Sequence, residues 1–66
     1  MGKVNEMYVT MIENCMKEAG LPLVGEEGVR WFQIACEIYD IFKNTRDPEK
    51  ETANFLKSYA KYEVAS

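Results

Sequence analysis

The chain has 66 residues, with eight Lys and Arg against eleven Asp and Glu, a net charge of −3 and a sequence pI near 4.8. A chain this short forms one domain and buries only about 60% of its unfolded surface, so its core is marginal without a staple or a partner. Because the cations are scattered singly among the acids, the chain lacks the basic stripe typical of nucleic-acid binding, and we expect no direct nucleic-acid partner.

The first periodic segment predicts a helix over residues 3–19. Its apolar residues recur at spacings of three and four and therefore share one face of a helix. They are Val4, Tyr8, Met11, Ile12, Cys15 and Ala19, with Met7 and Met16 on the flanks. We expect Gly20 to end this helix, because a left-handed backbone costs glycine little.

Residues 21–25 form the first connection, since Pro22 cannot continue a helix. Three large apolar residues in a connection are unusual, because loops normally run over the surface. We expect Leu21, Leu23 and Val24 to fold back and close one end of the core. The alternative is an exposed apolar loop that docks into a partner.

The second helix is predicted over residues 26–43 and is the most apolar segment of the chain. Gly25 serves as its N-cap, and Glu26 and Glu27 complement the helix dipole in the first turn. Gly28 weakens the start of this helix by about 1 kcal/mol. The polar residues of the apolar run fall at 30, 33, 37 and 40, so they lie on one side of the helix.

The third helix is predicted over residues 48–63. Asp47 is a suitable N-cap and Pro48 is pre-organised for the first helical position. We expect Phe55, Leu56 and Tyr59 to face inward. Three helices with two short connections predict an all-α, up-down-up three-helix bundle in which the strongly apolar second helix lies between the other two.

The side chains of the chain favour a protein without catalytic activity. There is no histidine, which is the commonest general base, and zinc normally needs four Cys or His ligands where this chain has two. Cys15 and Cys36 lie in apolar runs, so we expect two reduced, buried thiols. A disulfide between helices and a thiol redox sensor are the alternatives. We expect no enzyme activity, cofactor or metal.

The second helix carries two overlapping apolar faces. A helix between two neighbours can use both faces inside a monomer, whereas an unused face is available to a partner. We predict the second case, a homodimer or another protein partner held mainly through this helix, because aromatic residues are enriched in interface cores. The predicted interface residues are Trp31, Phe32, Ala35, Cys36, Tyr39 and Phe42.

These observations predict a small adaptor or inhibitor that acts by protein contact. The alternative is an inhibitor of a host defence nuclease from a phage or mobile element, of the anti-CRISPR or anti-restriction type. In that case the acidic Glu37 and Asp40 would engage a basic groove. No apolar run approaches the about 20 residues of a membrane span, and no signal-like apolar stretch follows Lys3, so the cytoplasm is the expected compartment.

Overall fold

The computed structural model describes the backbone of residues 2–65 and the side chains of residues 6–64. It contains three helices, α1 (Gly2–Glu18), α2 (Gly25–Phe42) and α3 (Pro48–Ala65), and no strand within residues 2–65. Each helix packs against both of the others. The prediction of an all-helical fold with three mutually packed helices is therefore confirmed. Helix α3 continues to Ala65, beyond the predicted end at residue 63.

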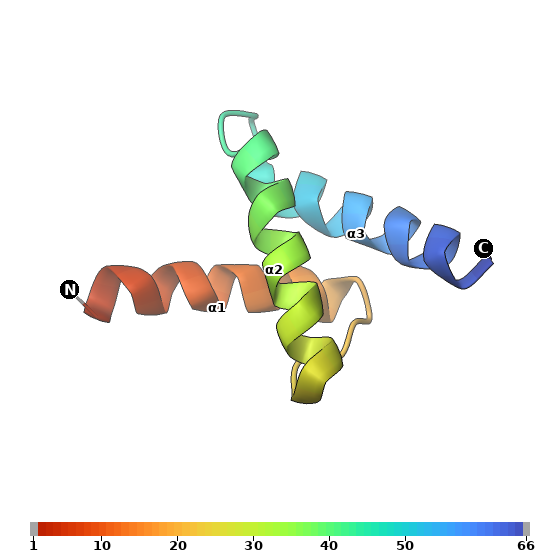
Figure 1. Ribbon diagram of the computed structural model, residues 1–66. Helices are drawn as coiled ribbons and strands as arrows, with labels where there is room; N and C mark the ends of the chain where they lie inside the picture. The colour runs from red at the N-terminus through yellow and green to blue at the C-terminus, as the bar shows by residue number, and fades with distance from the viewer. Residues whose placement is uncertain (1, 66) are drawn as a thin grey trace.

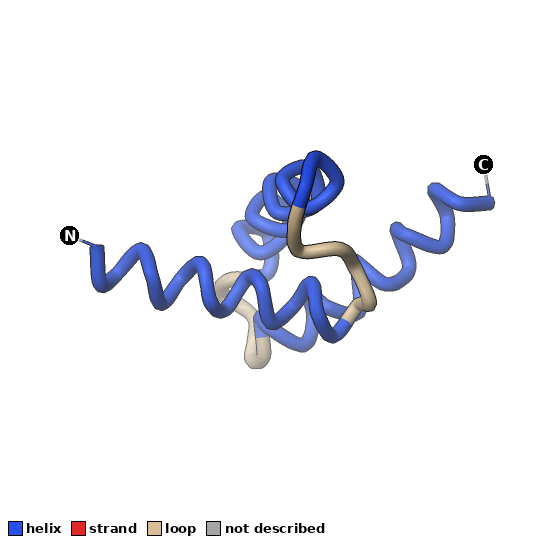
Figure 2. Tube along the Cα trace, turned by 90° about the horizontal axis from the view of Figure 1, so that it is seen from below, coloured by secondary structure: helices blue, strands red, loops and turns tan. Residues whose placement is uncertain are grey.

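The helices cross rather than run side by side. Figure 1 shows α2 lying steeply across α1, and in the perpendicular view of Figure 2 α2 is seen nearly along its axis while α1 runs across the picture. The predicted up-down-up arrangement of near-parallel neighbours is therefore not the one the structure adopts. Steeply crossed helices touch over a short central stretch. As a result, the first half of α1 and the last half of α3 extend away from the crossing in opposite directions (Figures 1 and 2).

Helix α1 ends as its sequence predicts. Gly20 has a φ of 76°, and its N–H donates to the carbonyl of Lys17 at 3.0 Å. The N–H of Leu21 donates to the carbonyl of Met16 at 2.9 Å. These two bonds form a Schellman motif, which satisfies carbonyls that a helix end leaves unpaired.

The first connection differs from the prediction at two residues. Leu21 and Leu23 pack against the core as expected, but Val24 is 82% exposed. Val24, not Gly25, is the N-cap of α2 and makes no side-chain capping bond. Gly25 is the first residue of α2 and has a φ of 78°, a conformation that favours glycine.

The start of α3 follows its capping signals. The side chain of Asp47 accepts a hydrogen bond from the backbone N–H of Lys50 at 3.3 Å, and its carbonyl accepts one from the N–H of Glu51 at 3.0 Å. Just before it, the hydroxyl of Thr45 donates to the carbonyl of Phe42 at 2.6 Å. These local bonds fix where α2 stops and α3 begins.

The core lies at the crossing and draws on all three helices. Its buried apolar residues are Ile12, Cys15, Met16, Trp31, Ala35, Ile38, Ala53 and Leu56. The small Ala35 and Ala53 are fully buried. Because they add little volume, the helix backbones can approach closely where they cross.

The inward faces of α1 and α3 include the predicted Ile12, Cys15 and Leu56, which are buried, and differ from the prediction at a few positions. On α1, Met16 is buried rather than on a flank, and Tyr8 is partly exposed; the side chain of Val4 lies outside the described residues. On α3, Thr52 and Ala53 are buried, while Phe55 is 47% exposed. The reason is the steep crossing, which places the N-terminal half of α3 against α1 with its smaller residues.

At Gly28 the backbone of α2 lies close to the backbone of the first connection. A Cβ atom on Gly28 would lie 2.5 Å from the backbone carbonyl carbon of Leu23. We expect Gly28→Ala to lower the stability to unfolding by about 1–3 kcal/mol, because the backbone must shift, although alanine is the better helix former by about 1 kcal/mol. Urea unfolding followed by circular dichroism measures this. Gln33→Ala, on the exposed side of α2, is the control. If the Gly28→Ala protein is more stable than wild type, Gly28 does not lie as close to the backbone of Leu23 as the structure shows.

Thr52 is a fully buried polar residue whose hydroxyl oxygen has no hydrogen-bond partner in the described part of the chain. A buried polar group without a partner costs about 1–3 kcal/mol. We expect Thr52→Val, which keeps the shape and removes the hydroxyl, to raise the stability by about 1 kcal/mol. Thr52→Ser keeps the hydroxyl, removes a methyl group, and is expected to lower it. A Thr52→Val protein that melts below wild type would show that the hydroxyl is satisfied.

Candidate interaction surfaces

The predicted interface residues of α2 are divided between the core and the contacts with the other helices. Trp31 and Ala35 are buried in the core. The remaining four are half-buried and pack against the core: Phe32, Cys36, Tyr39 and Phe42. The chain itself therefore covers most of the surface on which the helix 2 interface was predicted.

One flank of α2 packs against α1. The rings of Tyr8 and Tyr39 meet edge to face with their centroids 5.9 Å apart. Burial, together with the neighbouring side chain of Cys36, raises the pKa of Tyr8 to about 12. Cys36 and Tyr39 are thus occupied by α1 within the monomer.

The other flank of α2 packs against α3 through a run of aromatic rings. Trp31 meets Tyr59 edge to face at 5.9 Å. Phe42 lies 6.0 Å from Phe55, and Phe55 stacks on Tyr59 at 6.4 Å. Such spacings are typical of favourable aromatic pairs. Both apolar flanks of α2 therefore contact the other helices, while Val29 and Ile41 of α2 remain exposed.

The predicted acidic contact residues lie on the exposed side of α2. Glu37 and Asp40 are both exposed. Asp40 forms an ion pair with Lys43, whose Nζ lies 2.9 Å from Asp40 Oδ1. Because Lys43 offsets the charge of Asp40, Glu37 is the stronger acidic feature of this side.

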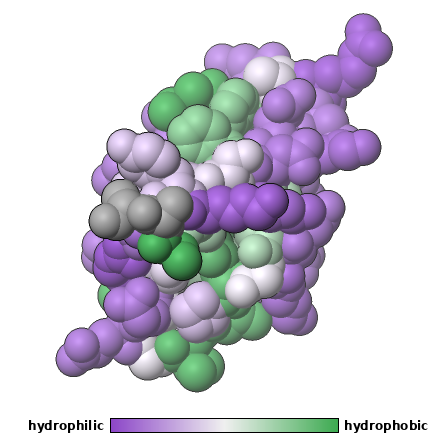
Figure 3. All heavy atoms as spheres, turned by 90° about the vertical axis from the view of Figure 1, so that its right-hand side faces the viewer, coloured by the Kyte–Doolittle hydropathy of each residue, from purple (hydrophilic) through white to green (hydrophobic). Residues whose placement is uncertain are grey.

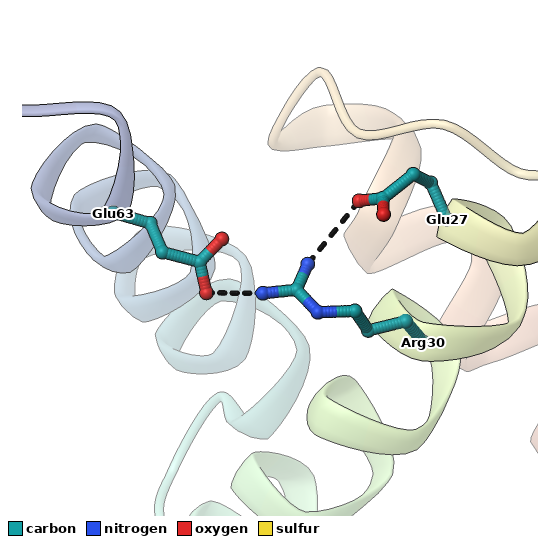
Figure 4. A network of polar contacts seen from close by, with 3 residues as sticks. All are labelled: Glu27, Arg30 and Glu63. Atoms are coloured by element: carbon teal, nitrogen blue, oxygen red, sulfur yellow. Dashed lines mark hydrogen bonds and ion pairs between the residues drawn. The ribbon is translucent and has the colours of Figure 1, made fainter.

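A cluster that the sequence analysis did not single out joins α2 to the last turns of α3. The guanidinium of Arg30 donates to Glu27 on its own helix at 3.2 Å and to Glu63 on α3 (Figure 4). It also lies over the ring of Trp31, 5.1 Å from the centroid. The hydrogen bond from Arg30 lowers the pKa of Glu63 and raises that of Arg30. The sequence pattern did not predict the pairing of Arg30 with Glu63, because the two residues are 33 positions apart and lie on different helices.

Neither cysteine has the setting of a reactive thiol. Both are free rather than joined in a disulfide. Cys15 is buried, its sulfur donates to the carbonyl of Glu49 at 3.5 Å, and burial with the nearby Glu49 and Glu18 raises its pKa to about 11. Cys36 is half-buried beside Tyr8. Within residues 6–64 no group of three Cys, Asp or Glu side chains has the arrangement of a metal site.

The exposed apolar side chains lie away from the crossing. They include Met7 on α1, Ile41 near the end of α2 and Tyr62 on α3, each at least 70% exposed. Figure 3, which looks onto the end of α3, shows hydrophobic side chains in separate patches among hydrophilic ones. These residues are absent from the predicted interface, because sequence periodicity does not show which parts of a helix extend beyond their neighbours.

Open grooves lined by residues of the described chain lie beside α1. The larger, of about 640 Å³, runs along residues 6–14 of α1 and reaches Glu49 in the first turn of α3. Its lining residues are Glu6, Met7, Tyr8, Thr10, Met11, Asn14 and Glu49. The smaller, of about 400 Å³, lies between α1 and the start of α2 and includes Met16, Val29 and Phe32. We call the larger one the α1 groove.

Comparison with known proteins adds no relative. No family model, curated protein or solved structure matches the chain. None of the helices within residues 2–65 is sufficiently long and apolar to cross a membrane.

The pair between Arg30 and Glu63 makes stability depend on pH. Because the pKa of Glu63 is lowered in the folded chain, its contribution is present above the ordinary glutamate pKa of about 4.3 and is lost as the pH falls through the lowered value. At neutral pH we expect the Glu63→Gln protein, which keeps Arg30 over Trp31, to have a lower melting temperature than wild type. In acid we expect the two proteins to have the same melting temperature. Thermal melts over a pH series measure this. Glu37→Gln, an exposed acid outside this cluster, is the control with the same charge change. A difference that persists at low pH would contradict this role.

Proposed function

We propose that this chain is a non-catalytic protein-interaction module that works as a homodimer. The observation that supports the proposal is the amount of surface that the monomer leaves exposed. A compact monomer of 7.6 kDa is expected to expose about 4300 Å², and this chain exposes 4954 Å². The excess of about 650 Å² is close to the about 800 Å² that each partner contributes to an interface of standard size.

The shape of the chain supports the same proposal. Its radius of gyration is 11.6 Å, against about 10.8 Å for a compact domain of this length. Its principal extents are 39 × 30 × 16 Å, so it is a flat body. A flat body of this size has much of its apolar surface at its faces and ends, where a second copy can cover it.

The side chains on this surface are of interface type. Met7, Ile41 and Tyr62 are exposed, and methionine and aromatic residues are enriched in the cores of interfaces. Trp31 and Ala35 are not part of the proposed interface, because they are core residues of the monomer.

An inhibitor that presents acidic residues to a basic groove is the alternative function. The net charge of −3 and the exposed Glu37 favour it, whereas the pairing of Asp40 with Lys43 weakens the acidic feature on which it depends. A thiol redox sensor has less support, because burial and a raised pKa make Cys15 a poor nucleophile.

The test of the proposed function is the oligomeric state in solution. We expect sedimentation equilibrium to give a dimer at tens of micromolar that dissociates reversibly on dilution, because the interface is of ordinary size and partly polar. The inhibitor alternative instead predicts a monomer that associates only when a basic partner is added. A single monomer mass over the whole concentration range would contradict the dimer.

A further inference from the structure

The α1 groove combines an apolar floor with acidic edges. Met7 and Met11 line it, and among the described side chains of residues 6–64 its charged lining residues are Glu6 and Glu49. Among residues 6–64, neither of these two acids forms an ion pair. Methionine side chains adapt to different apolar surfaces. A groove of this kind suits a helix that carries both apolar and cationic side chains.

The last turns of α3 carry side chains of the complementary kind. Lys57, Lys61 and Val64 are spaced by four and three residues and therefore share one flank of the helix. All three are exposed, Val64 at 89%, and neither lysine forms an ion pair within the described chain. Glu63, the only acid of these turns, is engaged by Arg30 (Figure 4). We call residues 57–64 the α3 tail.

The groove and the tail also match in length. Residues 6–14 of α1 line the groove, and at 1.5 Å per residue they span about 12 Å. The α3 tail spans about 11 Å by the same rise. The first half of α1 and the last half of α3 extend to opposite sides of the molecule (Figures 1 and 2). One copy therefore does not place its own tail in its own groove, and a contact between these two surfaces requires a second copy; in a two-fold dimer such a contact is made twice.

We propose that the α3 tail of one copy docks in the α1 groove of a second copy, and that the contact is reciprocal. Glu6 and Glu49 face Lys57 and Lys61 across the interface, while Val64 contacts the methionines of the groove. The inference rests on the proposed self-association and specifies its surfaces. The α1 groove and the α3 tail are both present on every copy of this chain, which favours a second copy over another protein with a basic helix as the occupant of the groove.

A charge-swap experiment tests this pairing. The groove variant is Glu6→Lys with Glu49→Lys, and the tail variant is Lys57→Glu with Lys61→Glu. Each variant alone brings like charges together, so we expect its dimer dissociation constant to rise by more than about tenfold. An equimolar mixture of the two variants restores opposite charges at both contacts, and we expect heterodimers with near wild-type affinity. Sedimentation equilibrium measures all three samples, and circular dichroism checks that each variant is helical.

Matched controls separate position from charge. Glu18→Lys with Glu37→Lys makes the same charge change outside the groove and is expected to leave the dimer intact. Met7→Glu in the groove is expected to weaken the dimer, while Val24→Glu, an equally exposed apolar residue in the first connection, leaves it unchanged. If the groove variant loses its helicity, the tail variant and the Met7 and Val24 pair still decide the question.

The outcomes distinguish the two proposals. A wild-type chain that stays monomeric contradicts the proposed function and this inference together. A wild-type dimer that persists in both charge variants leaves self-association standing and overturns the pairing of groove and tail. If only the groove variant loses the dimer, the groove binds another basic segment, and the pairing with the tail is overturned. A mixture of the two variants that fails to form heterodimers also overturns the pairing.

Discussion

The steep crossing of α2 over the other helices is the constraint on which the rest of the structure depends. Small residues at the crossing, Ala35 and Ala53, are fully buried and let the backbones come close. Once helices cross steeply, their contact is confined to the middle of each, and their ends extend beyond it. The large core side chains therefore gather at one place, while Met7 and Tyr62, on the outer parts of α1 and α3, remain exposed.

Local signals in the sequence determined where the helices begin and end. Gly20 and Asp47 act through bonds to residues within a few positions, so their roles follow from residue type alone. Gly28 is different: its position in the first turn of α2 suggests only a weak helix start, whereas the structure shows a close approach to the backbone of Leu23. Such a contact depends on the path of the connection, and no local propensity encodes it.

Surfaces were harder to predict than helices. The periodicity of α2 predicts a helix with apolar residues around most of its circumference, but the same pattern results whether α1 and α3 or another chain cover those residues. The edge-to-face contacts of Tyr39 with Tyr8 and of Trp31 with Tyr59 show that α1 and α3 cover part of this surface. The apolar residues that stay exposed, such as Met7 and Tyr62, lie where a helix extends beyond the helices it packs against. The position of these extensions depends on how the helices cross and not on the spacing of residues in the sequence.

The ion pair of Arg30 links the fold to the proposed contact between copies. By binding Glu63, Arg30 holds the last turns of α3 against α2 and offsets their only acidic charge. The remaining charges of the tail, Lys57 and Lys61, then act without an internal acid to oppose them. A loss of Arg30 would both loosen the orientation of the tail and return a negative charge beside the lysines. The ion pair between Arg30 and Glu63 thus joins α3 to α2 and also sets the charge of the α3 tail.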